Sequence, residues 1–314
     1  MGEQASKIGK KLEGYGEYLF PNMGWIELAH DKEIKCTRTS HKKRTHGIDL
    51  LFMYENPYSD KRQGVVVECK NRQMKSITQK DIEEWVKELI KNIECAQSAP
   101  ELENIDWNHT TLNTGLLLIH ANDAFDEEKF YKSLSEIKIP TRRNPINIFV
   151  AGNDKIDEWN SLLAVVRGYG NTFQFVYPSI NGFSRTTQKA VTIHSLYSKY
   201  ILAESQYITK EKTEDGYEYD KPNSQKILIF LDEIKKENFL YAWDLFKHYQ
   251  MEGASKYVFL FYPHKSGDVE FVKEEFLRTL KNCDNPIKEQ EAQKIELRFI
   301  DNRSLSPIEV GGEQ

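Results

Sequence analysis

An acidic residue and a lysine close an apolar run in the first quarter of the chain. The run Val65-Val66-Val67 is followed by Glu68, Cys69 and Lys70. β-Branched residues favour strands, and side chains alternate along a strand, so Glu68 and Lys70 are expected on one face and Cys69 on the other. Burying an acid and a lysine at a strand end costs free energy, which suggests that the two residues serve a function. A bound cation and a reacting anion would supply that purpose.

A second acid is predicted to approach from the preceding strand. Residues 47–54 (Gly-Ile-Asp-Leu-Leu-Phe-Met-Tyr) read as a strand, and the polar stretch 55–63, which contains Asn and Pro, reads as the loop between the two strands. An antiparallel hairpin centred near Ser59 places position 49 opposite position 69. Asp49 is therefore expected beside Glu68 and Lys70, so that two carboxylates and a lysine meet at one end of the hairpin.

This pattern resembles the PD-(D/E)XK nuclease superfamily, whose core is Asp…(Asp/Glu)-X-Lys. Here Asp49 is followed by Glu68-Cys69-Lys70, and Gly9-x-x-x-Glu13 precedes Gly24-Trp25, with Gly24 eleven residues after Glu13. That opening, and the form Gly47-Ile48-Asp49, are similar to Mrr-type restriction endonucleases and archaeal Holliday-junction resolvases. Ile48 stands where the superfamily often has proline. The resemblance covers roughly residues 7–95.

The resemblance implies a restriction-endonuclease-like fold and a metal-dependent deoxyribonuclease, an endonuclease that hydrolyses DNA with Mg²⁺, for which Mn²⁺ substitutes. Carboxylate and carbonyl oxygens suit such a cation. The implied metal ligands are Asp49, Glu68, the Cys69 backbone carbonyl and Glu13. Lys70 would hold or deprotonate the attacking water, or stabilise charge in the transition state. The implied catalytic set is therefore Glu13, Asp49, Glu68 and Lys70.

Alternatives accompany each of these assignments. Asp49, Glu68 and Lys70 also fit a structural ion pair at a strand end, although buried pairs seldom add net stability. Glu17 lies one helical turn after Glu13 and competes with it. Gln79, at the start of a later helix, is either an accessory contact to water or phosphate, or solvated surface.

Basic residues flank the proposed site on both sides in the sequence. The groups are Lys42-Lys43-Arg44, before the first acid, and Arg72 with Lys75, after the lysine. They are candidates for neutralising DNA phosphates, and the alternative is solvated charged loops. The formal net charge is −5, but residues 1–75 carry +4 and the remainder −9. That asymmetry suits an enzyme that meets DNA on one side, and it excludes a general nucleic-acid coat protein.

The cysteines and histidines show no familiar metal-binding spacing. Cys36, Cys69, Cys95 and Cys283 are scattered without Cys-x-x-Cys, and the histidines form neither His-x-x-x-His nor His-Glu-x-x-His. No apolar stretch approaches the length of a membrane span, and no apolar signal region is present. We therefore expect a reduced, cytoplasmic protein without membrane contact and without a zinc site.

The elements that must position the site are predicted as a mixed sheet flanked by helices, over residues 1–168. A helix over 6–20 ends at Pro21, and its apolar residues Leu12, Tyr15 and Leu19 share one face. A second helix follows Thr78, an expected N-cap in a capping box with Asp81. The remaining predicted elements are strands at 24–28, 115–119 and 145–150 and a helix at 126–137.

A second α/β domain is predicted over residues 169–314, for sensing, dimerisation or targeting. The predicted strands are 172–177, 227–231, 257–262 and 295–300, the predicted helices are 194–203, 237–250 and 269–281, and residues 210–225 read as an exposed loop. Residues 227–233 look like the Walker B strand of ATPases, but no Gly-x-x-x-x-Gly-Lys-Ser/Thr accompanies them. A homodimer, or a partner protein of a defence system, would bind through this domain.

The function that these features favour is DNA cleavage in prokaryotic genome defence, either restriction or anti-phage. A Holliday-junction resolvase or a repair nuclease is the alternative within the same class. The alternative from another class is a nuclease-like module that binds DNA or a partner without cutting. All the acidic and basic positions of the motif are present, which argues against a decayed site.

Overall fold

The computed structural model describes residues 2–139, 144–178 and 185–305, with the backbone alone for residues 2–9. The chain divides into two compact units, residues 1–160 with 303–314, and residues 161–302. The division falls inside helix α4 (Asn153–Tyr169). Compactness alone does not show that a unit folds separately, so a domain boundary after residue 168 stays a prediction.

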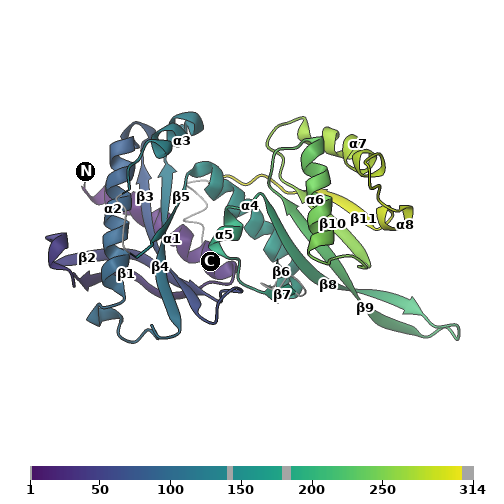
Figure 1. Cartoon of the computed structure of the whole chain (residues 1–314), viewed down its shortest axis with the longest axis horizontal. Coiled ribbons are helices and arrows are strands. Elements are labelled where there is room, and N and C mark those ends of the chain that lie inside the picture. Colours follow the sequence, from purple (N-terminus) through teal and green to yellow (C-terminus); the bar gives the residue numbers. More distant parts are fainter. Residues whose placement is uncertain (1, 140–143, 179–184, 306–314) are drawn as a thin grey trace. The chain divides into compact units, whose positions relative to one another are not determined.

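The first unit is a mixed sheet with strand order β1-β2-β3-β4-β5 (Figure 1). β2 runs antiparallel to β1 and β3, whereas β3, β4 and β5 are parallel to one another. The strands are β1 (Ile26–Lys35), β2 (Thr45–Tyr54), β3 (Arg62–Arg72), β4 (Thr110–Ala121) and β5 (Asn147–Ala151). Together with the second unit described below, this confirms the predicted fold class of a restriction-endonuclease-like mixed α/β sheet followed by further α/β structure.

Helix α1 (Gly2–Asn22) packs on one face of this sheet. Its apolar residues Leu12, Tyr15 and Leu19 are buried, as the spacing predicted. A Cβ on Gly16 would lie 2.6 Å from Leu50 Cδ1, so any larger residue there would force the Leu50 side chain, between α1 and β2, to shift. The predicted end before Pro21 was wrong: proline removes one backbone donor but keeps a helical φ, so the last turn continues to Asn22.

The other face is covered by α2 (Gln79–Ala96) and α3 (Glu127–Ser135). The predicted capping box is present, because Thr78 Oγ1 accepts from the Asp81 amide and Asp81 Oδ2 accepts from the Thr78 amide. Val86 and Leu89 of α2 and Phe130 of α3 share one core with Leu51 and Val66 of the sheet. Short 3₁₀ turns complete the unit: η1 (Thr39–His41), η2 (Met74–Ser76) and η3 (Pro100–Leu102).

The second unit is another mixed sheet, in the order β11-β10-β9-β8-β6-β7 (Figure 1). β9, β10 and β11 are parallel, and the other neighbours are antiparallel. Its strands are β6 (Gln174–Pro178), β7 (Arg185–Gln188), β8 (Tyr200–Lys212), β9 (Glu218–Phe230), β10 (Lys256–Phe261) and β11 (Ile295–Phe299). Its other elements are η4 (Gly170–Thr172), α5 (Ile193–Leu196), α6 (Lys236–His248), α7 (Asp268–Lys281) and α8 (Glu289–Ala292).

An aromatic core holds α6 and α7 against this second sheet. Phe239 of α6 and Phe276 of α7 pack edge to face, with ring centroids 5.1 Å apart, and Phe276 lies 5.2 Å from Phe261 of β10. Such pairs add about 0.5–1.5 kcal/mol beyond the area they bury. The predicted helices at 237–250 and 269–281 are confirmed.

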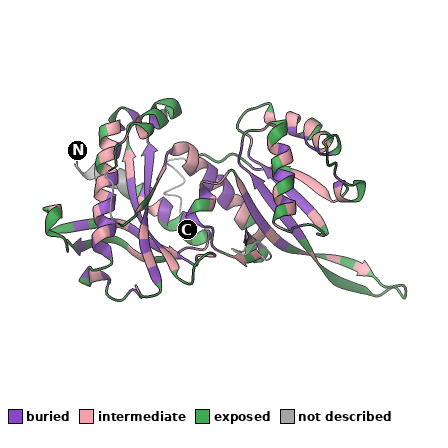
Figure 2. Cartoon of the chain, viewed as in Figure 1, coloured by how far each residue is buried: buried purple, intermediate pink, exposed green. Residues whose placement is uncertain are grey.

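The predictions for 194–203 and 210–225 were wrong. The helix is confined to Ile193–Leu196, and Tyr200 begins β8, which forms a long hairpin with β9 around a turn at 213–217. The outer half of this hairpin is exposed on both strands (Figure 2). Because neither face is buried there, no apolar alternation marks the strands in the sequence. Cross-strand pairs such as Lys221 with Glu211, at 2.8 Å, link them instead.

Candidate active site

The acids and the lysine lie where strands β2 and β3 part. Backbone pairing runs from Tyr54↔Gln63 to Leu50↔Val67, and Asp49 and Glu68 are the next residues beyond it. The predicted register, with position 49 opposite 69, was therefore wrong by one residue, because the hairpin is centred between Tyr58 and Ser59. This error does not move Asp49 away from Glu68 and Lys70, because all three residues lie beyond the last backbone pair of β2 and β3.

Asp49 links the two strands through its side chain. Its Oδ2 accepts a hydrogen bond of 2.7 Å from the Cys69 amide. Burial is the main reason that the pKa of Asp49 is raised, while the Cys69 amide and the charge of Lys70 oppose the rise. The neighbouring strand thus orients the Asp49 carboxylate, and nearby positive charge compensates its negative charge only in part.

Glu68 is held between Lys70 and a helix. Its Oε1 forms an ion pair with the Lys70 ammonium, and its Oε2 lies 3.4 Å from Asn92 Nδ2 of α2. Asn92 is buried and also donates to the Gly47 carbonyl, at 2.8 Å. The pKa of Glu68 is raised to about 7, chiefly by burial and then by the charge of Asp49, while Lys70 opposes the rise. A buried acid whose pKa lies near neutral pH is typical of functional sites.

Glu13 joins the acids from the other face of the sheet. It is half-buried on α1, and its pKa is raised first by burial and then by the charge of Asp49. That repulsion places Glu13 within electrostatic reach of Asp49. Glu17, one turn further along α1, is exposed. The arrangement therefore favours Glu13 over Glu17 as the helix residue beside the acids.

The predicted DNA-contacting residues are exposed in the first unit. Lys42, Lys43 and Arg44 form the loop between η1 and β2, Arg72 ends β3, and Lys75 lies in η2. Lys43 forms an ion pair with Glu88 of α2, so part of its charge is already neutralised. These residues remain candidates for phosphate contact.

Gln79 has a structural partner. Its side-chain amide donates a 2.8 Å hydrogen bond to the Glu136 carbonyl at the end of α3. The bond ties the start of α2 to α3 and occupies one of the donors that an accessory contact to phosphate would use. A structural role therefore explains Gln79 better than the accessory role.

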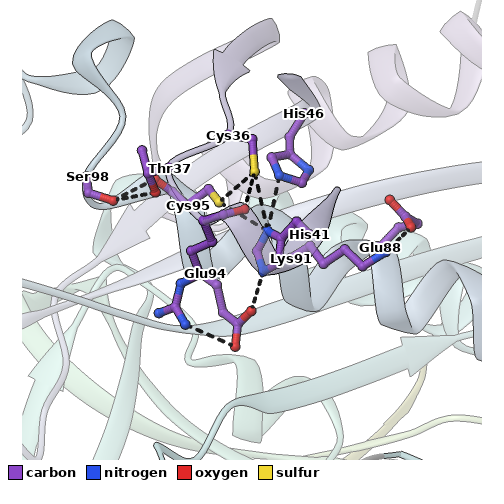
Figure 3. Close-up of polar contacts among 10 residues, drawn as sticks. Cys36, Thr37, His41, His46, Glu88, Lys91, Glu94, Cys95 and Ser98 are labelled. Carbon is purple, nitrogen blue, oxygen red and sulfur yellow. Dashed lines mark hydrogen bonds and ion pairs between the residues drawn. The ribbon is translucent and has the colours of Figure 1, made fainter. Parts of the chain in front are cut away.

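Four further side chains converge in this unit, although they are scattered in the sequence and no zinc site was predicted. Cys36, His41, His46 and Cys95 place one sulfur or ring nitrogen each within 4.8 Å of one another (Figure 3). The three ligands nearest in sequence follow at equal intervals, as Cys-x-x-x-x-His-x-x-x-x-His. That spacing was the available signal, and it was missed because the fourth member comes from a distant helix.

The donor set at the acids suits a hard divalent cation. The predicted ligands are the Asp49, Glu68 and Glu13 carboxylates and the Cys69 carbonyl, all of them oxygens. A cation at this place would compete with the Lys70 ammonium for Glu68, and it would offset both the burial and the charge of Asp49 that raise the pKa of Glu68. Among the helices within the described ranges, none is long and apolar enough to cross a membrane.

Comparison with known protein families adds independent evidence. Residues 1–155 match the family model of the GAPS4 protein PD-(D/E)XK nuclease domain. Neither a curated protein nor a solved structure matches the chain. The matched region ends within α4 and contains Glu13, Asp49, Glu68 and Lys70. The narrower resemblance to Mrr-type enzymes and resolvases stays a prediction. The N-terminal half of this chain is a nuclease domain of the PD-(D/E)XK superfamily.

Proposed function

We propose that the protein is a Mg²⁺-dependent endonuclease that hydrolyses phosphodiester bonds in DNA. The strongest support is the meeting of Asp49, Glu68 and Lys70 at the point where β2 and β3 part, inside a domain of the nuclease superfamily. A structural ion pair explains Glu68 and Lys70 but not the half-buried Asp49 beside them, whose charge destabilises ionised Glu68. Such electrostatic conflict is expected where a cation binds.

Each residue has a proposed task. Asp49, Glu68 and the Cys69 carbonyl would hold the cation, with Glu13 binding it directly or through water. When bound, the cation lowers the pKa of water and stabilises charge on the phosphate. Lys70, released from Glu68 once the cation takes that carboxylate, would orient the attacking water or stabilise the developing charge. Asn92 would keep the Glu68 carboxylate in place from α2.

The direct test is cleavage of supercoiled, linear and branched DNA and of single-stranded RNA, with Mg²⁺, with Mn²⁺ and with EDTA. We expect metal-dependent cutting of DNA that is lost in Asp49→Asn. Asp60→Asn is a matched control, because Asp60 is an exposed acid in the turn of the same hairpin. Cutting confined to branched DNA would indicate a resolvase. DNA binding without cutting under any metal would indicate the non-cleaving module.

A role in genome defence is the further part of this proposal, and it follows from the resemblance to restriction enzymes. The test is plaque formation on cells that express the protein, with Asp49→Asn cells as the control. Protection that needs Asp49 would support the role. Protection that is equal in both would separate defence from cleavage.

The second unit is proposed to regulate or target cleavage, through a homodimer or a partner protein. It contributes none of the proposed catalytic residues. Residues 303–305 return to the first unit, where the Leu305 amide donates to Asp157 Oδ1 at 2.7 Å. A fragment that ends at residue 168 would lose this contact. The role of the second unit is therefore better tested by substitutions on its exposed hairpin in the full chain.

A further inference from the structure

Three neighbouring elements and one distant helix bring the Cys/His cluster together. Cys36 directly follows β1, His41 ends η1, His46 lies in β2, and Cys95 lies near the end of α2. Figure 3 shows the side chains turned toward one another. Cys95 and His46 are buried, and the His41 side chain is only 6% exposed. The cluster is thus closed to solvent on most sides.

Four of the six separations between the ligand atoms lie between 3.4 and 3.8 Å. The two sulfurs, Cys36 Sγ and Cys95 Sγ, lie 3.8 Å apart. His41 Nδ1 lies 3.6 Å from Cys36 Sγ, 3.4 Å from Cys95 Sγ and 3.4 Å from His46 Nε2. The two remaining pairs lie within 4.8 Å.

These distances match the edges of a tetrahedron around zinc. With Zn–S bonds of about 2.3 Å and Zn–N bonds of about 2.0–2.1 Å, tetrahedral geometry separates two sulfurs by about 3.8 Å, a sulfur and a nitrogen by about 3.6 Å, and two nitrogens by about 3.3 Å. Each of the four resolved separations lies within about 0.2 Å of its expected edge. Four side chains from separate elements would reach this spacing only by coincidence if nothing lay between them.

Hydrogen bonding accounts for the arrangement only in part: Cys36 Sγ can donate to the Arg38 carbonyl, at 3.2 Å, but three other contacts of the cluster converge on one nitrogen. An imidazole nitrogen either donates or accepts a single hydrogen bond. His41 Nδ1 faces three polar atoms at 3.4–3.6 Å, so at least two of them lack a hydrogen bond from it. A cation at the centre would satisfy all four ligands at once. Two thiolates would also balance its charge in a buried place.

The surroundings orient the ligands as they do in known metal sites. His41 Nε2, the nitrogen that faces away from the cluster, lies 2.9 Å from Glu94 Oε2. A carboxylate behind a ligating histidine fixes its tautomer and strengthens it as a ligand. Thr37 Oγ1, one residue after Cys36, and Ser98 Oγ, three residues after Cys95, lie 2.9 Å apart and make a second link between the same segments.

We propose that Cys36, His41, His46 and Cys95 bind one structural Zn²⁺ ion. Four protein ligands leave no open position, which distinguishes structural from catalytic zinc sites. The ion would fasten the connection between β1 and β2 to the end of α2. His46 comes three residues before Asp49, and Lys42–Arg44 lie between the two histidines. The ion would therefore hold both the strand of the proposed active site and the loop of candidate DNA contacts.

The first experiment measures metal content in the full-length protein, purified without metal-affinity resin, by inductively coupled plasma mass spectrometry. We expect about one zinc per chain in the wild type and in Cys283→Ser, and almost none in Cys95→Ser or His46→Asn. Cys283 is a matched control, because its Sγ contacts only the Leu280 and Asn285 carbonyls among the described residues. Glu68→Gln must keep its zinc, since zinc that depends on Glu68 would belong to the acids and overturn the proposal. This readout is independent of any DNA cleavage.

A second measurement needs no variant. A mercurial thiol reagent added to the wild-type protein should release zinc to a colorimetric dye as two thiols react per ion. Replacement by Co²⁺ should give the visible spectrum of a tetrahedral thiolate site. Wild-type protein that takes up no zinc from solution overturns the proposal, and so does protein that holds iron in its place. A Cys36–Cys95 disulfide, which requires the sulfurs to approach to about 2.05 Å, also overturns it.

Discussion

The acids around Asp49 and the Cys/His cluster lie in the same unit but differ in the kind of metal ion that their ligand atoms suit. The acids offer oxygen ligands and have raised pKa values, and Glu68 is held by a lysine that a cation must displace. The cluster offers sulfur and nitrogen at separations that already match a bound ion. We therefore expect an exchangeable, reactive cation at the acids and a permanently bound ion at the cluster.

The difference suggests that the metals at these two places act on different properties. A cation at the acids should control turnover, and it should add stability only to the extent that it offsets the cost of ionising them. A cation at the cluster should control folding, because four ligands from separate segments meet only in the native state. Variants at the two places should therefore separate loss of activity from loss of stability.

The largest effects are expected on cleavage. Asp49→Asn should abolish cutting and weaken Mg²⁺ binding, because it removes a charged ligand. Lys70→Met should lower the rate by about 10²–10³-fold while Mg²⁺ and DNA binding remain, because a protonated lysine offers the cation no lone pair. Cleavage, metal titration and DNA binding are measured separately on each variant. Cutting at the wild-type rate by Lys70→Met would mean that the strand motif is structural.

The next largest effect is expected on stability. Cys95→Ser should lower the free energy of unfolding by more than about 3 kcal/mol, since it removes a zinc ligand as well as a buried side chain. Asp49→Asn should leave stability unchanged or raise it, because a neutral amide replaces a carboxylate whose ionised form is disfavoured. Denaturant unfolding at fixed pH compares the two. Equal losses in both variants would erase the distinction between the sites.

Asn92→Ala should have an intermediate effect, because it removes a group that orients Glu68. We expect a 10–100-fold loss of Mg²⁺ affinity or rate, the usual range for residues behind a metal ligand. The pH at which activity rises should also move upward, since ionised Glu68 loses a hydrogen-bond donor. An unchanged pH profile with lower stability would mean that Asn92 serves only the Gly47 carbonyl.

The pH dependence of stability should reveal Glu68. Its folded-state pKa is raised to about 7 from an ordinary value of 4.5, so its contribution to stability is fully present below pH 4.5 and is lost as the pH rises through about 7. Wild-type protein without added Mg²⁺ should lose stability between about pH 5 and 8 relative to Glu68→Gln. Added Mg²⁺ should reduce that difference at pH 8. Omission of Mg²⁺ is preferred to a chelator, which would also remove zinc.

The smallest effects are expected in the basic loop between the two histidines. Lys42→Ala should weaken DNA binding and lower the salt dependence of the logarithm of the affinity by about one unit of slope. Lys43→Ala should do less, because Glu88 already neutralises Lys43. Fluorescence anisotropy over a salt series measures both, with Lys210→Ala on the exposed hairpin of the second unit as the control. Equal losses in all three variants would assign the effect to net charge alone.

Local patterns in the sequence were enough to predict much of the first unit. The buried face of α1, the capping box of α2 and the strands of the sheet each depend on residues a few positions apart, so their side chains interact within one element. The family was identified for the same reason, because its motif lies on one hairpin and one helix. The hairpin register was missed by one residue, because the length of a polar loop does not determine which residue lies at its centre.

The sequence by itself determined which residues carry oxygen ligands and a lysine at a strand end, because the pattern and the chemistry coincide over Asp49 to Lys70. Only the tertiary structure decided the partners that the motif does not contain: Asn92 behind Glu68, and Cys95 beside Cys36, 59 positions away in the chain. It also decided that residues 200–230 form a hairpin. The two strands pair along their whole length, although neither face of the outer half is buried. Contacts of this kind depend on how helices pack on a sheet and how strands pair across it, and no spacing within a single segment encodes them.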